Sequence, residues 1–271
     1  MITMIKRTIR NRGLVKDFIY RDFKARFAGS ILGFAWNILH PLVMILIYVM
    51  IFSQVMKAKL PGSSSGYGYS IYLCSGLLPW SMFNELLMRY TQTFLEHSNL
   101  IKKVSFPREI LHVSALLSGC INFAIGFTIF VFFLAILHVT GRHQVEISLG
   151  QTILLLLGLG FQQVFCLGLG LAFSVLNVFF RDVGQLVMII AQLWFWVTPI
   201  VYPLSVIPEK LKLIFVLNPM YHFMSIYRSV LYVNQAPEWK TLGIVSAISI
   251  ITFVIGYGIY NKLVTDVSDE I

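Results

Sequence analysis

The stretch "ILHVSALLSGCINFAIGFTIFVFFLAILHV", residues 110–139, contains no Asp, Glu, Lys or Arg. A helix needs about 20 mainly apolar residues to cross the hydrocarbon core of a bilayer. This stretch exceeds that length, and the charged residue Glu109 stands at its edge. It is therefore predicted to form a transmembrane helix, and the rest of the chain has to be interpreted around it.

The composition of the whole chain agrees with a membrane location. The 271 residues are 57% hydrophobic and 12% charged, with a mean hydropathy of +0.78. A soluble domain carries about 25% charged residues. Because this chain lacks enough polar side chains to cover a water-facing exterior, we predict an all-α, polytopic integral membrane protein.

The same length criterion predicts six spans, at residues 31–56, 70–95, 110–139, 152–178, 185–202 and 242–260. The second contains Glu85 and Arg89, and the fifth is short and ends in "TPIVYP". Residues 203–239 contain four prolines and several charged residues. We predict short helices there that re-enter the membrane from outside, because irregular backbone at membrane depth is tolerated where protein buries it. Residues 1–271 are predicted to form one transmembrane domain.

The segment before the first span alternates apolar and charged residues in "GLVKDFIYRDFKARFAGS", residues 13–30. Residues 11–29 are predicted to form an amphipathic helix in the membrane interface, with basic residues toward lipid phosphates. The simpler interpretation is that this helix anchors the chain at the membrane; a role in gating would come in addition to anchoring.

The distribution of Lys and Arg predicts the orientation, because cytoplasmic loops carry an excess of both. The first 26 residues contain eight basic side chains, and the loop between the second and third spans adds Lys102, Lys103 and Arg108. The short loops on the other side carry only Lys57, Lys59 and Arg142. Both termini are therefore predicted to be cytoplasmic, and the net charge of +9 indicates orientation and contact with anionic lipids. We expect no nucleic-acid binding, because no basic soluble module with interspersed aromatic residues is found.

The chain shows no motif of a catalyst. There is no Walker A loop, His and Cys residues lack metal-ligand spacing, and Cys74, Cys120 and Cys166 offer no disulfide framework. Glu85 and Arg89 form an acid–base pair inside a predicted span, four residues apart with the acid first. A structural intramembrane ion pair is the simpler interpretation, and a contact with substrate is the alternative. We expect neither an enzyme nor a cofactor in this chain.

The most polar stretch between long apolar segments is "HSNLIKKVSFPREI", residues 97–110. Apolar residues stand there beside Lys102 and Lys103, and exposed apolar groups in a cytosolic loop indicate a partner's groove. The alternative is a solvated loop whose charge only sets the orientation of the chain. The residues alone leave both possibilities open.

Three blocks together resemble the membrane subunit of polysaccharide ABC exporters. They are "RDFKARFAGSILGFAWNILHPLVMILIYVMIFS" (21–53), "NLIKKVSFPREIL" (99–111) and "NVFFRDVGQLVMIIAQLWFWVTPIVYP" (177–203). The resemblance extends from the N-terminal helix to the last span, and it is closest to O-antigen permeases, with capsule and teichoic-acid permeases related. It implies a bacterial inner-membrane subunit that forms a homodimer and pairs with two copies of a separate ATPase, on which ATP and Mg²⁺ bind.

The resemblance also implies roles for two cytosolic loops. The loop at 97–107 matches a coupling helix that sits in a cleft of the ATPase. The second contact matches Asn177 to Gly184, where Arg181 and Asp182 are the polar residues available. The coupling residues in the first loop are Ser98, Asn99, Leu100, Ile101, Lys102, Lys103, Val104, Phe106 and Pro107.

The implied substrate is a polysaccharide on an undecaprenyl diphosphate lipid. Aromatic rings suit a sugar conduit, and the candidates are Trp36, Tyr48, Phe52, Trp194, Phe195 and Trp196; packing or a place at the membrane interface is the alternative. Arg21, Lys24 and Arg26 are candidates for a diphosphate entrance, with lipid anchoring as the alternative. A drug or small-lipid exporter, and a membrane-embedded enzyme acting on polyprenyl-linked sugar, are the rival functions.

Overall fold

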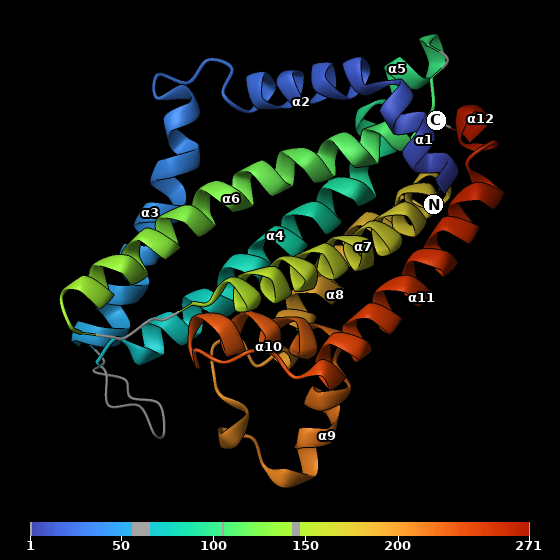
Figure 1. Cartoon of the computed structure of the whole chain (residues 1–271). Coiled ribbons are helices and arrows are strands. Elements are labelled where there is room, and N and C mark those ends of the chain that lie inside the picture. Colours follow the sequence, from blue (N-terminus) through green and yellow to red (C-terminus); the bar gives the residue numbers. More distant parts are fainter. Residues whose placement is uncertain (1, 56–65, 105, 143–146, 271) are drawn as a thin grey trace.

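The computed structural model describes residues 2–55, 66–104, 106–142 and 147–270, and Figure 1 draws the remainder as a thin grey trace. Every regular element in these ranges is helical. The end of the first predicted span at Met56, residue 105 of the predicted coupling loop, and Lys57 and Lys59 lie outside the described residues.

Two helices precede the bundle: α1 (Ile2–Arg10) and α2 (Arg12–Arg26). A 3₁₀ turn, Gly33–Ala35, leads into α3 (Trp36–Val49), which continues as a wider helical segment over Met50–Val55. The bundle is then built from α4 (Gly68–Glu96), α6 (Glu109–Val139), α7 (Leu149–Phe179) and α8 (Asp182–Val197), with the short α5 (Ser98–Lys103) between α4 and α6. The chain ends with α9 (Glu209–Leu217), α10 (Pro219–Leu231), α11 (Trp239–Leu263) and α12 (Val267–Glu270).

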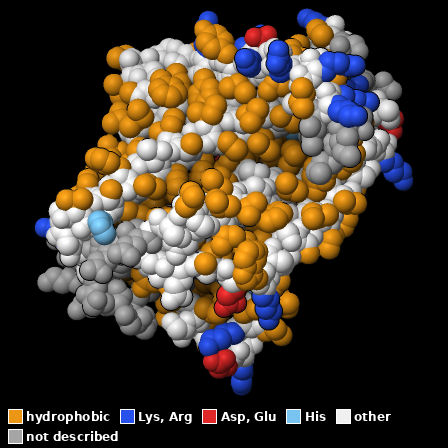
Figure 2. Space-filling model, in the orientation of Figure 1, with side chains coloured by type: hydrophobic (Ala, Val, Ile, Leu, Met, Phe, Trp, Pro, Cys, Tyr) orange, Lys and Arg blue, Asp and Glu red, His pale blue; other side chains and the backbone are white. Residues whose placement is uncertain are grey.

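Figure 1 shows how the two ends of the molecule differ. Helix α2 lies across one end of the bundle, and α1, α5, α12 and both chain termini are at that same end. Helix α9 is at the opposite end. Hydrophobic side chains cover most of the face shown in Figure 2, while Lys and Arg gather at the ends near α1 and α2 and near α9.

Four segments of the described chain are long and apolar enough to cross a membrane: Gly33–Ser53, Glu109–Val139, Leu149–Phe179 and Trp239–Leu263. They correspond to the first, third, fourth and sixth predicted spans. Helix α4 has 29 residues, but it is more polar than these four; α8 is apolar but has only 16 residues. The expectation of an all-helical polytopic membrane protein is thus confirmed. Four of the six expected spans coincide with helices that are candidates for crossing a membrane by length and composition.

The fifth predicted span, 185–202, is shorter in the structure because α8 ends at Val197. Thr198 is extended, as the residue before a proline prefers, and its hydroxyl donates to the carbonyl of Trp194. Residues 203–239 hold α9 and α10 as two short helices, separated at Asn218, whose side chain accepts from the backbone N–H of Met220. The sequence-based expectation of short helices in this region is met.

The core lies where α7 packs between α4 and α11. Glycines permit this packing: a Cβ added at Gly256 of α11 would lie 1.9 Å from the carbonyl oxygen of Gly168 in α7. A Cβ at Gly170 would lie 2.2 Å from the ring of Tyr90 in α4. Small residues let membrane helices approach closely enough for extensive van der Waals contact. The helices α4, α7 and α11 therefore form one tightly packed unit.

Candidate functional site

A network of four charged side chains joins α2 to α4 at the end of the bundle where the termini lie. Within α2, Arg26 lies 3.5 Å from Asp22, and within α4, Arg89 lies 3.8 Å from Glu85. The shorter contacts run between the helices: Arg89 to Asp22 at 2.7 Å and Arg26 to Glu85 at 2.8 Å. Each carboxylate therefore has its best partner on the other helix.

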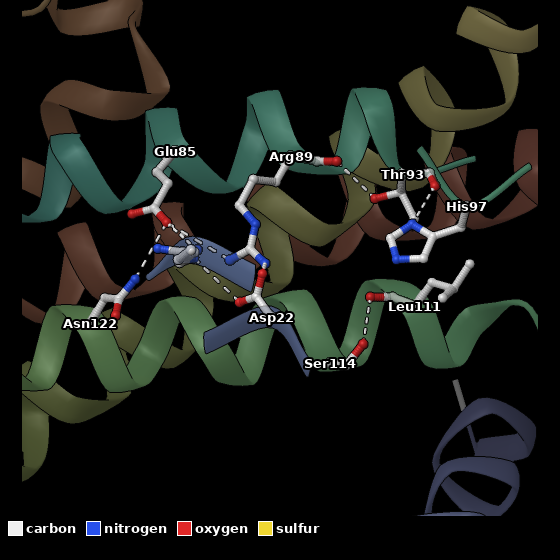
Figure 3. Close-up of polar contacts among 9 residues, drawn as sticks. Asp22, Glu85, Arg89, Thr93, His97, Leu111, Ser114 and Asn122 are labelled. Atoms are coloured by element: carbon white, nitrogen blue, oxygen red, sulfur yellow. Dashed lines mark hydrogen bonds and ion pairs between the residues drawn. The ribbon is translucent and has the colours of Figure 1, made fainter. Parts of the chain in front are cut away.

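Figure 3 shows the surroundings of this network. Asn122 of α6 points toward Glu85, and its Nδ2 donates to Oε1 at 3.5 Å. Since α2 itself packs against α6, the charged side chains lie partly exposed among three helices. Partly buried charges are stabilised when they alternate in sign and hydrogen-bond. The arrangement fixes the position of α2 over α4 and α6.

The network separates two hollows in the protein. On one side, a cavity of about 820 Å³ extends from Arg21 and Phe18 of α2 past Arg89 to His97, Asn99 and Leu100 near α5. On the other side, a cavity of about 290 Å³ between α3, α4 and α6 is mainly apolar and includes Trp36 and Tyr48. Arg26 and Glu85 line both cavities. The ion pair between them thus lies where the two cavities meet, and the larger cavity has more charged residues in its lining.

Helix α5 follows α4 with only His97 between them. Ile101 is 8% exposed and packs into the core, whereas Val104 is 50% exposed. The ring of Phe106 lies 5.9 Å from that of Phe18 in α2. Of the predicted apolar docking residues, Val104 is therefore the best placed to meet a partner, together with the exposed Lys102 and Lys103.

The loop from Asn177 to Gly184 is held against α4 by one side chain. Asn177 Nδ2 donates to the carbonyl of Thr91 at 2.9 Å, and its Oδ1 accepts from the backbone N–H of Gly184 at 2.8 Å. Arg181 and Asp182 are exposed beside it. Both loops predicted to meet an ATPase are therefore attached to the same end of α4.

The aromatic candidates occupy different environments. Trp194 packs against Phe83 and Phe165 and donates to Asn218 Oδ1 at 2.7 Å, whereas Trp196 is 57% exposed. Successive residues on a helix are turned by about 100°, so the three aromatics at 194–196 have to face different directions. Phe195 is half-buried, and its ring lies 5.6 Å from that of Trp80 in α4.

The first-span candidates lie near each other. The rings of Tyr48 and Phe52 are 6.5 Å apart, and Phe52 lies 4.9 Å from Tyr69 of α4. Trp36 is half-exposed at the start of α3 and donates to the hydroxyl of Ser30 at 3.2 Å.

The basic candidates of α2 also differ. Arg21 lines the larger cavity, Lys24 is exposed, and Arg26 is engaged by Glu85 and Asp22.

Sequence reasoning did not single out Asp22, Asn122 or Asn177 as site residues. The spacing of Glu85 and Arg89 revealed their place on one helix face, but not the partners on α2. Among the described residues, no group of three or more His, Cys, Asp or Glu side chains could hold a metal ion.

Residues 14–232 match the ABC-2 type transporter family. The match covers more than half of the chain, and the protein belongs to this family of ABC exporters as a non-catalytic transmembrane permease subunit.

The chain is similar to the O-antigen export system permease protein RfbA of Myxococcus xanthus, with 30% identity over 93% of this chain and 92% of the relative. A Klebsiella pneumoniae protein of the same name is 32% identical over 90% of this chain and 89% of its own. The polysialic acid transport protein KpsM of Escherichia coli is 23% identical over 91% and 92%. The resemblance to polysaccharide export permeases expected from the three sequence blocks is thus confirmed.

Proposed function

We propose that this permease moves an undecaprenyl-diphosphate-linked polysaccharide, O-antigen in the first place, across the bacterial inner membrane with energy from a separate ATPase. The observation that carries the proposal is the common attachment of two loops to α4. α5 continues α4 directly, and Asn177 ties the loop at 177–184 to it. A force applied to either loop would reach the ion-pair network, which is on the same helix.

In this proposal, α3, α4, α6, α7, α8 and α11 are the six spans. The α2 and α5 end faces the cytoplasm with both termini, because the basic N-terminal segment and Lys102 and Lys103 are at that end. Helix α2 lies in the interface, and α9 and α10 re-enter from the outside. The ATPase would contact α5 and the loop containing Arg181 and Asp182, and bind ATP and Mg²⁺ on its own chain.

The proposed conduit forms between two copies of the chain. Helices α3 and α8 support this, because both expose long apolar faces; in α3, Ile45 alone is buried. Trp36, Tyr48, Phe52, Phe195 and Trp196 are the aromatic candidates for its wall, whereas the contacts of Trp194 are those of a core residue. Arg21 and Lys24 would attract the diphosphate, and Arg26 could receive it only after releasing Glu85.

The experiment is reconstitution of the permease with its ATPase in proteoliposomes, supplied with lipid-linked polysaccharide. ATP should drive the glycan to the far side, where an added glycosidase degrades it. Small hydrophobic compounds should not replace the glycan in stimulating ATP hydrolysis. Transport by the isolated permease, or stimulation by drugs alone, would overturn the proposal. If the complex preferred capsular polymer or teichoic acid, the proposed mechanism would stand and only the substrate would differ. The similarity to the polysialic acid transport protein KpsM agrees with such an outcome.

A further inference from the structure

A groove of about 410 Å³ runs between α4 and α8. Its wall on α4 consists of Trp80, Asn84 and Met88, which are spaced four apart and therefore share one helix face. Its wall on α8 consists of Met188, Ala191, Gln192, Phe195 and Trp196. Sites of this volume hold small molecules or segments of larger ones.

The groove contains two primary amides without a partner in the described chain. Neither the side chain of Asn84 nor that of Gln192 makes a hydrogen bond to any described residue. Asn84 is half-buried, and Gln192 is exposed on α8 among apolar side chains. By contrast, Gln162 and Asn177 are paired inside the bundle: Gln162 donates to the carbonyl of Pro79 at 2.8 Å, and Asn177 donates to that of Thr91 at 2.9 Å. An unpaired amide facing hydrocarbon is unfavourable. Asn84 and Gln192 therefore indicate that something polar occupies or passes this groove.

The lining excludes an ionic occupant. None of the eight residues carries a charge, so a diphosphate would lose its hydration without gaining a cation. The aromatic residues Trp80, Phe195 and Trp196 supply apolar faces, and the planes of Phe195 and Trp196 are turned by 79° to each other. A hydrocarbon tail would match the rings but leave both amides unsatisfied. A sugar ring has both required surfaces, apolar C–H faces and hydroxyls that donate and accept.

We propose that the α4–α8 groove is a saccharide subsite in which Asn84 and Gln192 hydrogen-bond the hydroxyls of a passing sugar ring. The inference rests on the proposed export of polysaccharide, and it adds Trp80, Asn84 and Gln192 to the conduit. An amide both donates and accepts, so it can bind hydroxyls of different stereochemistry. Two neutral hydrogen-bonding groups hold a ring weakly enough for a polymer to advance.

The test uses the permease–ATPase complex and lipid-linked polysaccharide in proteoliposomes. The pair Asn84→Leu and Gln192→Leu removes both amides at similar volume, and should lower the transport rate about tenfold, as expected for the loss of two ordinary hydrogen bonds. The pair Asn84→Gln and Gln192→Asn keeps both amides and should restore most of that loss. Copurification with the ATPase checks that each variant is assembled.

A second measurement does not depend on transport. Gln192→Cys, in a chain whose three native cysteines are replaced, is labelled with a maleimide in the presence of the same polysaccharide freed of its lipid. The glycan should slow labelling severalfold, and inorganic diphosphate should not. A disulfide between Cys replacements at 192 in two copies would show a dimer contact instead and overturn the subsite.

Different experimental results would contradict the proposed function and the proposed subsite. Absence of glycan transport by the unaltered complex contradicts the proposed function. Normal transport by the leucine pair, together with unprotected labelling at position 192, contradicts the subsite alone.

Discussion

The guanidinium of Arg89 in α4 lies 2.7 Å from the carboxylate of Asp22 in α2, although the two residues are 67 positions apart. Their side chains are each about a quarter exposed. The contact joins the helix that lies across the end of the bundle to the helix that leads into α5. It is therefore a measurable link between the N-terminal segment and the proposed site of ATPase contact.

We predict that Asp22 and Arg89 are energetically coupled. Either single change, Asp22→Ala or Arg89→Ala, leaves a partly buried charge with a weaker partner, and the double change removes both. A double-mutant cycle on thermal unfolding in detergent should give a coupling free energy of about 1 kcal/mol. Strictly additive effects of the two changes would show that the contact contributes nothing. Lys24→Ala is the matched control, because its side chain is exposed on the same helix.

Val104→Asp should uncouple ATP hydrolysis from transport. Val104 is exposed beside Lys103, so a carboxylate there should disturb a partner's apolar groove without entering the core of the permease. ATP-dependent glycan transport should fall at least tenfold while the protein remains folded. Ile101→Asp is the contrasting variant: Ile101 is buried, so this change should lower stability as well. Normal coupling in Val104→Asp would contradict docking at α5.

Gly256→Ala should destabilise the bundle. The added methyl would meet the backbone carbonyl oxygen of Gly168 at 1.9 Å, so the backbones of α7 and α11 would have to move apart. Overpacking of this kind costs about 1–3 kcal/mol. Gly258→Ala is the control: it lies two residues further along the same helix, and the added Cβ has no neighbour within 4 Å. Its unfolding temperature should not fall, because alanine favours a helix where there is room for it. Equal behaviour of the two variants would contradict the close contact of α7 and α11.

Trp194→Phe should affect stability, whereas Trp196→Phe should affect transport. The first loses the 2.7 Å hydrogen bond to Asn218 and should reduce stability by about 1 kcal/mol. The second changes an exposed ring and should leave stability intact while slowing glycan transport. Unfolding temperature and transport rate, measured on both variants, separate the two roles. Reduced stability of Trp196→Phe would remove it from the proposed conduit wall.

Cysteine labelling should establish the orientation. With the native cysteines replaced, a membrane-impermeant maleimide should label Thr140→Cys in intact spheroplasts, because Thr140 follows α6 at the end opposite α5. Lys102→Cys should react only after lysis. The reverse pattern would place α5 outside the cell and exclude contact with a cytosolic ATPase.

The helical class and most spans could be predicted from the sequence, because long runs without charge such as 110–139 have few other stable solutions. Helix α4 was harder: it is long enough, but Glu85 and Arg89 reduce its apolar character. The partners of these two residues could not be predicted, since Asp22 and Arg26 approach them only through tertiary packing. Similarly, "WFW" at 194–196 indicates aromatic character, but which ring faces outward depends on the neighbours of α8.

Asn177 connects the loop before α8 to the carbonyl of Thr91, within two turns of the point where α4 passes into α5. One helix, α4, thus contacts both places where an energy-supplying subunit would push. Within one copy of the permease, we therefore expect the two displacements to be coupled. In the proposed homodimer, alternation during a transport cycle would therefore arise between the copies, each responding to its own nucleotide state.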